Sequence, residues 1–239
     1  MGSRYRLQAA GGLVYSARRF GKSTEALGWI GEQKTAGEFN SDEWNELCIG
    51  FSRDLEPDVA FQILRSDIDE DIRANVLRYF KVEGSTLKES LDYVKNSLNL
   101  KSPAESELAY GNAYRKWIAE DPMQVIQYSY GDGNYNSDDE FAPIEYALKE
   151  LVDRNPREAV NWFEMAVTNP DHKEAIAKGI VREWLRVDSI DASTWVSEIK
   201  DPIVKSDAVT TLVDFLVHKG DLEAAAIWEK EVSDSGKLP

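Results

Sequence analysis

Small and large side chains recur together along the chain at a period close to 33 residues. The small residue of each repeat stands at Ala26, Ala60, Ser90, Val125, Ala159, Ala192 and Ala225, with steps of 34, 30, 35, 34, 33 and 33 residues. A large residue follows each after three positions, the spacing of one helix face, at Trp29, Ile63, Tyr93, Tyr128, Trp162, Trp195 and Trp228. We call these seven pairs the ladder. Such a recurrence predicts an array of helical repeats.

Each repeat contains the signals of two helices. In the four C-terminal repeats another large residue lies eleven positions before the ladder aromatic, at Trp117, Leu151, Trp184 and Val217. Residues that cap helix starts lie seven positions before it, at Asp121, Asn155, Asp188 and Asp221. Asn155 with Glu158, and Asp171 with Glu174, also have the spacing of a capping box. Each repeat is therefore predicted to be two antiparallel helices joined by a tight turn.

These signals extend over the whole chain. The expected helices cover residues 6–18, 22–33, 41–53, 57–65, 69–81, 85–97, 103–119, 122–130, 143–154, 156–168, 172–187, 189–199, 202–218 and 221–233. No segment sustains the alternation of a strand. We expect an all-α fold, a right-handed α-solenoid (superhelix) of about seven antiparallel helical hairpins. It is predicted to form a single helical-repeat domain over residues 1–239, with the best-defined repeats in 105–233.

The period and the paired helices resemble the tetratricopeptide class of helical repeat. The chain is more similar to bacterial arrays built from D-P-x-x-A-x-x-W units. This likeness rests on Asn155-Pro156 with Ala159 and Trp162, and on Asp121-Pro122 with Val125 and Tyr128. Because such arrays are mostly of unassigned function, the resemblance implies a superhelical scaffold and assigns no catalytic residue to this chain.

The composition excludes some classes of protein. With 239 residues, 42% of them hydrophobic, the chain is long enough and apolar enough for a sizeable core. Its net charge of −15 argues against nucleic-acid binding, which needs a basic surface. No apolar run approaches the roughly 18 residues of a membrane span. Residues 1–3 are interpreted as an expression-derived start, before which a native leader or anchor could have been removed, so the compartment is left open, with the cytoplasm slightly favoured.

Charge is unevenly distributed along the chain. Residues 1–120 hold 16 basic and 19 acidic side chains, whereas residues 121–239 hold 12 and 24. The first 22 residues carry five basic side chains and no acid. A partner of the C-terminal half is therefore expected to be basic, and head-to-tail self-association is a further use of this asymmetry.

One repeat departs from the helical pattern at residues 131–142. Its glycines and asparagines favour turns, and loops on rigid scaffolds often carry function. The candidate partner-binding residues in and beside this loop are Tyr130, Asp132, Tyr135, Asp138, Asp139 and Glu140. An irregular calcium site and a merely solvated loop are the alternatives. The EF-hand pattern itself fails, because Ser137 replaces its glycine and Pro143 its bidentate glutamate.

The sequence shows no catalytic motif, metal-ligand spacing or cofactor fingerprint. Cys48 is the single cysteine, and His172 and His218 lie 46 residues apart in no metal-ligand pattern. We therefore expect a non-catalytic protein–protein interaction scaffold that binds a protein or peptide on a solenoid surface, without a cofactor. The alternative is a ligand- or calcium-binding protein, or a helical-repeat enzyme, that uses the acidic loop 131–142.

Overall fold

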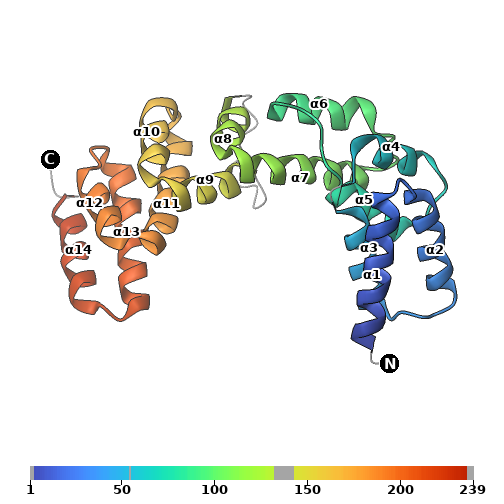
Figure 1. The fold of residues 1–239 in the computed structure, drawn as a ribbon. Coiled ribbons are helices and arrows are strands. Elements are labelled where there is room, and N and C mark those ends of the chain that lie inside the picture. Colours follow the sequence, from blue (N-terminus) through green and yellow to red (C-terminus); the bar gives the residue numbers. More distant parts are fainter. Residues whose placement is uncertain (1–2, 54, 132–142, 236–239) are drawn as a thin grey trace. The chain divides into compact units, whose positions relative to one another are not determined.

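The computed structural model describes residues 3–53, 55–131 and 143–235, and in them the chain is all-α (Figure 1). These residues form fourteen helices and no strand. In the first half the helices are α1 (Ser3–Arg19), α2 (Ser23–Thr35), α3 (Ser41–Ser52), α4 (Pro57–Arg65), α5 (Glu70–Tyr79), α6 (Leu87–Ser97) and α7 (Pro103–Glu120). In the second half they are α8 (Pro122–Gly131), α9 (Pro143–Arg154), α10 (Pro156–Ala166), α11 (Pro170–Val187), α12 (Ser189–Glu198), α13 (Pro202–Lys219) and α14 (Leu222–Ser235).

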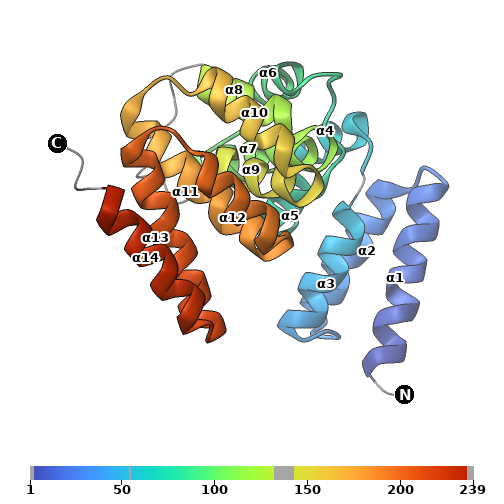
Figure 2. The same cartoon turned by 90° about the vertical axis from the view of Figure 1, so that its left-hand side faces the viewer.

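The chain divides into two compact units, Met1–Trp117 and Ile118–Pro239, which we call the N-terminal and C-terminal units. In the N-terminal unit, α1 packs on α2 and α3, and α3 packs on α5. Figures 1 and 2 both show α1, α2 and α3 side by side. The first helices of consecutive hairpins therefore contact one another directly. The single repeat domain expected over residues 1–239 stays a prediction.

Side chains of α7 link the helices of the N-terminal unit by hydrogen bonds to two backbone carbonyls and one hydroxyl. Asn112 Nδ2 donates to the Phe80 carbonyl at 2.8 Å, and Arg115 Nη2 donates to the Arg78 carbonyl at 2.7 Å. The indole Nε1 of Trp117 donates to Ser90 Oγ at 2.8 Å. Each bond joins residues at least 27 positions apart in the chain. The bonds of Asn112 and Trp117 satisfy polar groups that would otherwise be buried without partners.

The C-terminal unit repeats one packing arrangement. The first helices α9, α11 and α13 pack in succession, and each contacts its own second helix, α10, α12 or α14. Each second helix that has a successor hairpin also packs on the next first helix, as α10 does on α11 and α12 on α13. Figure 2 shows α11, α12, α13 and α14 as neighbours. The helices therefore pack in sequential order.

Ladder aromatics form the core of this unit. Trp162 and Trp195 are buried, as is Trp184 on α11. The rings of Trp184 and Trp195 lie 5.9 Å apart, and Phe163 meets Trp195 edge-on at 6.1 Å. The prediction that the ladder is core is confirmed at these positions, whereas Trp29, Tyr93, Tyr128 and Trp228 are half-buried.

The expected helices are all present, with ends displaced by no more than three residues. Three predicted caps are confirmed, because the aspartate side chain accepts a hydrogen bond from a backbone N–H in the first turn of its helix. Asp121 accepts from Gln124, Asp188 from Ile190 and Asp191, and Asp221 from Ala224.

Two predicted caps are wrong. Asn155 makes no side-chain cap to the backbone. The Asn155 side-chain amide instead donates to Glu158 Oε2 at 3.3 Å. Asp171 does not precede its helix, because α11 begins at Pro170.

Candidate functional site

Of the residues predicted from the acidic loop, only Tyr130 lies within the described part of the chain. Asp132, Tyr135, Asp138, Asp139 and Glu140 lie outside it. The Tyr130 ring is half-buried and meets Trp162 edge-on at 5.6 Å and His172 edge-on at 5.8 Å. Tyr130 thus joins α8 to α10 and α11 through ring packing.

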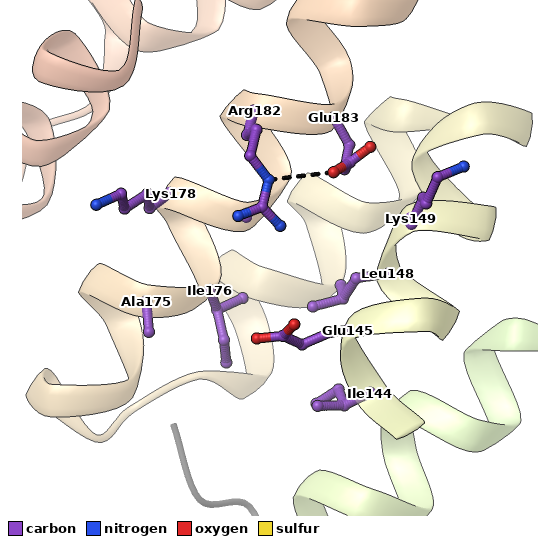
Figure 3. A pocket seen from close by; sticks show the side chains of 10 residues that line it. Ile144, Glu145, Leu148, Lys149, Ala175, Ile176, Lys178, Arg182 and Glu183 are labelled. Atoms are coloured by element: carbon purple, nitrogen blue, oxygen red, sulfur yellow. Dashed lines mark hydrogen bonds and ion pairs between the residues drawn. The ribbon is translucent and has the colours of Figure 1, made fainter. Parts of the chain in front are cut away.

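A hollow of about 190 Å³ lies between α9 and α11 (Figure 3). Its floor consists of Ile144 and Leu148 from α9 and Ile176 from α11, all buried. These side chains form an apolar stripe because residues four apart share a helix face. Ala175 and Gly179 complete the α11 wall and leave the space open because they are small. We call this hollow the α9–α11 groove.

The rim of the groove carries three basic and two acidic side chains: Lys149, Lys178, Arg182, Glu145 and Glu183. Figure 3 shows Glu145 reaching from α9 toward α11, while the ammonium groups of Lys149 and Lys178 point outward on either side. The rim is therefore of mixed charge, although the half of the chain that contains it is strongly acidic.

Some rim charges are already paired. Glu183 accepts from Arg182 Nε at 3.1 Å and from Arg186 Nη1 at 2.6 Å, and Lys149 pairs with Asp153 at 2.9 Å. Glu145 and Lys178 make no ion pair within the described residues. These two groups are available to a ligand without breaking an existing pair.

Gly179 stands in the middle of α11, where glycine is unfavourable. A mid-helix glycine costs about 1 kcal/mol relative to alanine. A Cβ at Gly179 would meet no atom within 4 Å, so packing does not require the glycine. Its effect is to keep the groove open. Sequence reasoning missed this site, although a glycine inside a strong helical pattern was a signal that could have indicated it.

The N-terminal unit has a second groove, which also lies between two first helices and is also lined by glycine. It lies between the first helices α1 and α3 and has a volume of about 570 Å³. Gly11 and Gly50 line it, and a Cβ at either glycine would meet no atom within 4 Å. Its charged lining residues are Glu46 and Arg53. In both units, a groove therefore opens where the first helices of successive hairpins meet at a glycine.

Other reactive groups are engaged in the fold. Burial raises the pKa of the Cys48 thiol to about 12, so the thiolate that would act as a nucleophile is scarce near neutral pH. Lys34 binds Asp69 at 2.7 Å and Asp71 at 3.1 Å, which joins α2 to the start of α5. Within the described residues, no three His, Cys, Asp or Glu side chains gather as a metal site.

No helix in the described part of the chain is both long enough and apolar enough to cross a bilayer. Comparison with protein-family models, with curated proteins and with solved structures gives no match.

Proposed function

We propose that this chain is a non-catalytic protein–protein interaction scaffold, a tetratricopeptide-like right-handed α-solenoid that binds a peptide on the surface of its first helices. The packing of each first helix on the next, as α9, α11 and α13 pack in the C-terminal unit, supports the solenoid arrangement. Solenoids of this kind offer extended surfaces on which binding residues vary independently of the core.

The observation that carries the proposal is the α9–α11 groove. It combines a buried apolar floor, a charged rim and a wall kept open by Gly179. Binding sites commonly have this composition, in which apolar surface gives affinity and a few polar groups fix orientation. Because α9 and α11 are held in place by the core, the groove is a preformed rigid surface, which reduces the ordering cost of binding.

The rim defines the chemistry of the peptide. The hollow takes one small or medium apolar side chain over Ile176 and Gly179. Glu145 accepts a hydrogen bond from a backbone N–H or a basic group, and Lys178 pairs with a carboxylate. The peptide we propose therefore carries an apolar anchor with charges of both signs beside it. This differs from the basic partner that the uneven charge distribution predicts.

The test fills the hollow without disturbing the helix. Gly179→Gln puts a longer side chain into the groove, and glutamine is a better helix former than glycine. Gly28→Gln is the matched control, because Gly28 is also a mid-helix glycine with no atom within 4 Å of its Cβ position, but it lies on α2. Peptides are selected from a random-sequence phage library on the wild-type protein, and their affinities for the three proteins are measured by fluorescence anisotropy.

We expect Gly179→Gln to weaken the selected peptides at least about tenfold, equivalent to 1.4 kcal/mol, and Gly28→Gln to leave them unchanged. Equal binding to all three proteins would remove the α9–α11 groove as the site. Failure to enrich any peptide would contradict the proposed function itself.

A further inference from the structure

The α9–α11 groove contains two opposite charges that face each other without pairing. Figure 3 shows the guanidinium of Arg182 and the carboxylate of Glu145 pointing toward one another across the hollow, with Ile176 on one side and Leu148 on the other. Within the described residues, neither Glu145 nor the Nη atoms of Arg182 make a hydrogen bond or an ion pair. A cation and an anion therefore stand unpaired on opposite sides of one apolar hollow.

Glu183 fixes the position of the arginine. Its side chain is only 12% exposed, and it accepts from Arg182 Nε at 3.1 Å and from Arg186 Nη1 at 2.6 Å. The guanidinium, held at Nε, keeps its Nη groups directed into the hollow (Figure 3). A guanidinium edge binds a carboxylate with two parallel hydrogen bonds. Arg182 is therefore oriented for a carboxylate before any ligand arrives, which reduces the ordering cost of binding.

The hollow has room for a ligand of about one residue. Its volume of about 190 Å³ is below the roughly 300–1,000 Å³ of pockets that bind drug-sized molecules. The floor is aliphatic, with Ile144, Leu148 and Ile176 all buried, and Gly179 leaves the space beside it open. A ligand that satisfies this site combines a short aliphatic chain, a carboxylate and a cationic group.

We propose that the α9–α11 groove binds a free aliphatic α-amino acid. The α-carboxylate pairs with Arg182, the α-ammonium pairs with Glu145, and the side chain lies on the aliphatic floor. A residue inside a peptide offers neither charge, because its α-nitrogen and its carboxyl group are both amides. A free amino acid thus complements both unpaired groups at once, and charge complementarity of this kind gives specificity.

The amino acid and the peptide would occupy the same space. Competition between them rests on the proposed function, whereas binding of the amino acid itself does not. Where both bind, the free amino acid regulates the scaffold by displacing the peptide from the α9–α11 groove.

The first test titrates L-leucine into the full chain and follows backbone amide resonances by NMR. Because the Arg182 side chain is 57% exposed, water weakens its ion pairs, and we expect a dissociation constant of about 1 mM. Three analogues each lack one part of the ligand. These are 4-methylpentanoate without the ammonium, 3-methylbutylamine without the carboxylate, and glycine without the side chain. Each should bind at least about tenfold more weakly than leucine.

The second test assigns each charge to its partner. Glu145→Gln and Arg182→Gln should each weaken leucine about tenfold. Glu145→Gln should also bind leucine and 4-methylpentanoate alike, and Arg182→Gln should bind leucine and 3-methylbutylamine alike. The matched controls are Glu150→Gln on α9 and Lys178→Gln on α11, which remove a charge from the same helices. Both controls should bind leucine as the wild type does, because Glu150 pairs with Arg154 and the Lys178 ammonium points outward (Figure 3).

The outcomes separate this inference from the proposed function. A wild type whose resonances do not move with leucine would overturn the inference, and so would equal weakening in all four variants. Neither measurement uses a peptide, so they decide the inference even where no peptide is enriched from the library. With a selected peptide in hand, leucine should raise its apparent dissociation constant in fluorescence anisotropy. Leucine that binds without displacing the peptide would overturn the competition.

Discussion

The two units hold their helices together by different chemistry. In the N-terminal unit, polar side chains of α7 reach back to carbonyls of residues 78–84, and Arg73 on α5 binds Glu105 on α7. In the C-terminal unit, aromatic rings provide the corresponding contacts between helices, with Trp195 between Phe163 and Trp184. Both units have a buried apolar core, and beyond it the described part of the N-terminal unit is joined chiefly by side-chain hydrogen bonds to carbonyls and that of the C-terminal unit chiefly by ring contacts.

The length of particular connections accompanies this difference. In the N-terminal unit, residues 80–86 separate α5 from α6 and residues 98–102 separate α6 from α7. Backbone groups in such connections lack helical partners and need donors from elsewhere. In the C-terminal unit, Asn155 and Asp188 are the entire connections that follow α9 and α11. Short connections leave few carbonyls unpaired, and the interface can be filled by apolar rings.

The largest expected effect comes from removing a ring of the C-terminal unit. Trp195→Ala should destabilise the fold by about 3 to 5 kcal/mol, because a buried aromatic is lost and a cavity remains. Trp228→Ala, at the half-buried end of the ladder, should cost about 1 to 2 kcal/mol. Urea denaturation at low protein concentration and high salt measures both. Equal costs would show that the inner and terminal rings are packed alike.

The next effect concerns the buried ion pair of the N-terminal unit. Arg73 is buried and donates to Glu105 from Nε at 2.6 Å and from Nη2 at 3.0 Å, and it also bonds the carbonyls of Leu64 and Asn99. Glu105→Gln should cost about 2 to 4 kcal/mol, because it leaves the arginine charge without its counterion. Glu150→Gln, which breaks an exposed pair with Arg154, should cost less than about 0.5 kcal/mol.

The same ion pair has a predicted pH dependence. The hydrogen bond from Arg73 is the main cause that holds the pKa of Glu105 below its ordinary value. Stabilisation from a lowered pKa is complete above the unfolded value, about 4.3, and disappears as the pH falls through the folded value. The stability difference between wild type and Glu105→Gln should therefore narrow in acid, as measured by urea denaturation from pH 7 down to pH 3. A constant difference would contradict this assignment.

A smaller effect is expected at Ser90, a ladder position of the N-terminal unit that takes part in a hydrogen bond. Ser90 occupies the place that Ala159 and Ala192 occupy in the C-terminal unit, and it accepts a hydrogen bond from Trp117 Nε1. Ser90→Ala should cost about 1 to 2 kcal/mol, because it leaves a buried N–H unpaired. In a Trp117→Phe background, which lacks that N–H, the same change should cost less than about 0.5 kcal/mol. A double-mutant cycle measures the coupling.

Helix positions and the ladder core could be predicted from the sequence because both depend on local spacing. Ala159 with Trp162, and Ala192 with Trp195, lie on one helix face, so their burial follows from period and size. Asp188 could be predicted as a cap because its partners, Ile190 and Asp191, lie within three residues.

The hydrogen bonds between distant residues of the N-terminal unit could not be predicted in this way. Asn112 meets the Phe80 carbonyl 32 residues away, and that pairing depends on how the 80–86 connection folds back. The α9–α11 groove was missed for a related reason. A small residue such as Gly179 becomes a recess only when the neighbouring helix is placed beside it, and the sequence does not give the distance between α9 and α11.

The smallest expected effect is an increase in stability when a groove glycine is replaced by alanine. It tests why both units have glycines in their grooves. Gly179→Ala in the C-terminal unit and Gly50→Ala in the N-terminal unit should each stabilise the fold by about 0.5 to 1 kcal/mol, because alanine restricts the unfolded chain and neither Cβ meets an atom within 4 Å. Gly28→Ala, outside both grooves, should give a similar gain in the same urea denaturation. If replacing Gly179 or Gly50 destabilises the fold while replacing Gly28 does not, the helices that line the grooves need these glycines for packing. If all three substitutions stabilise, packing does not explain the glycines at the grooves, and the cost they impose on the helices is consistent with a requirement for open binding surface.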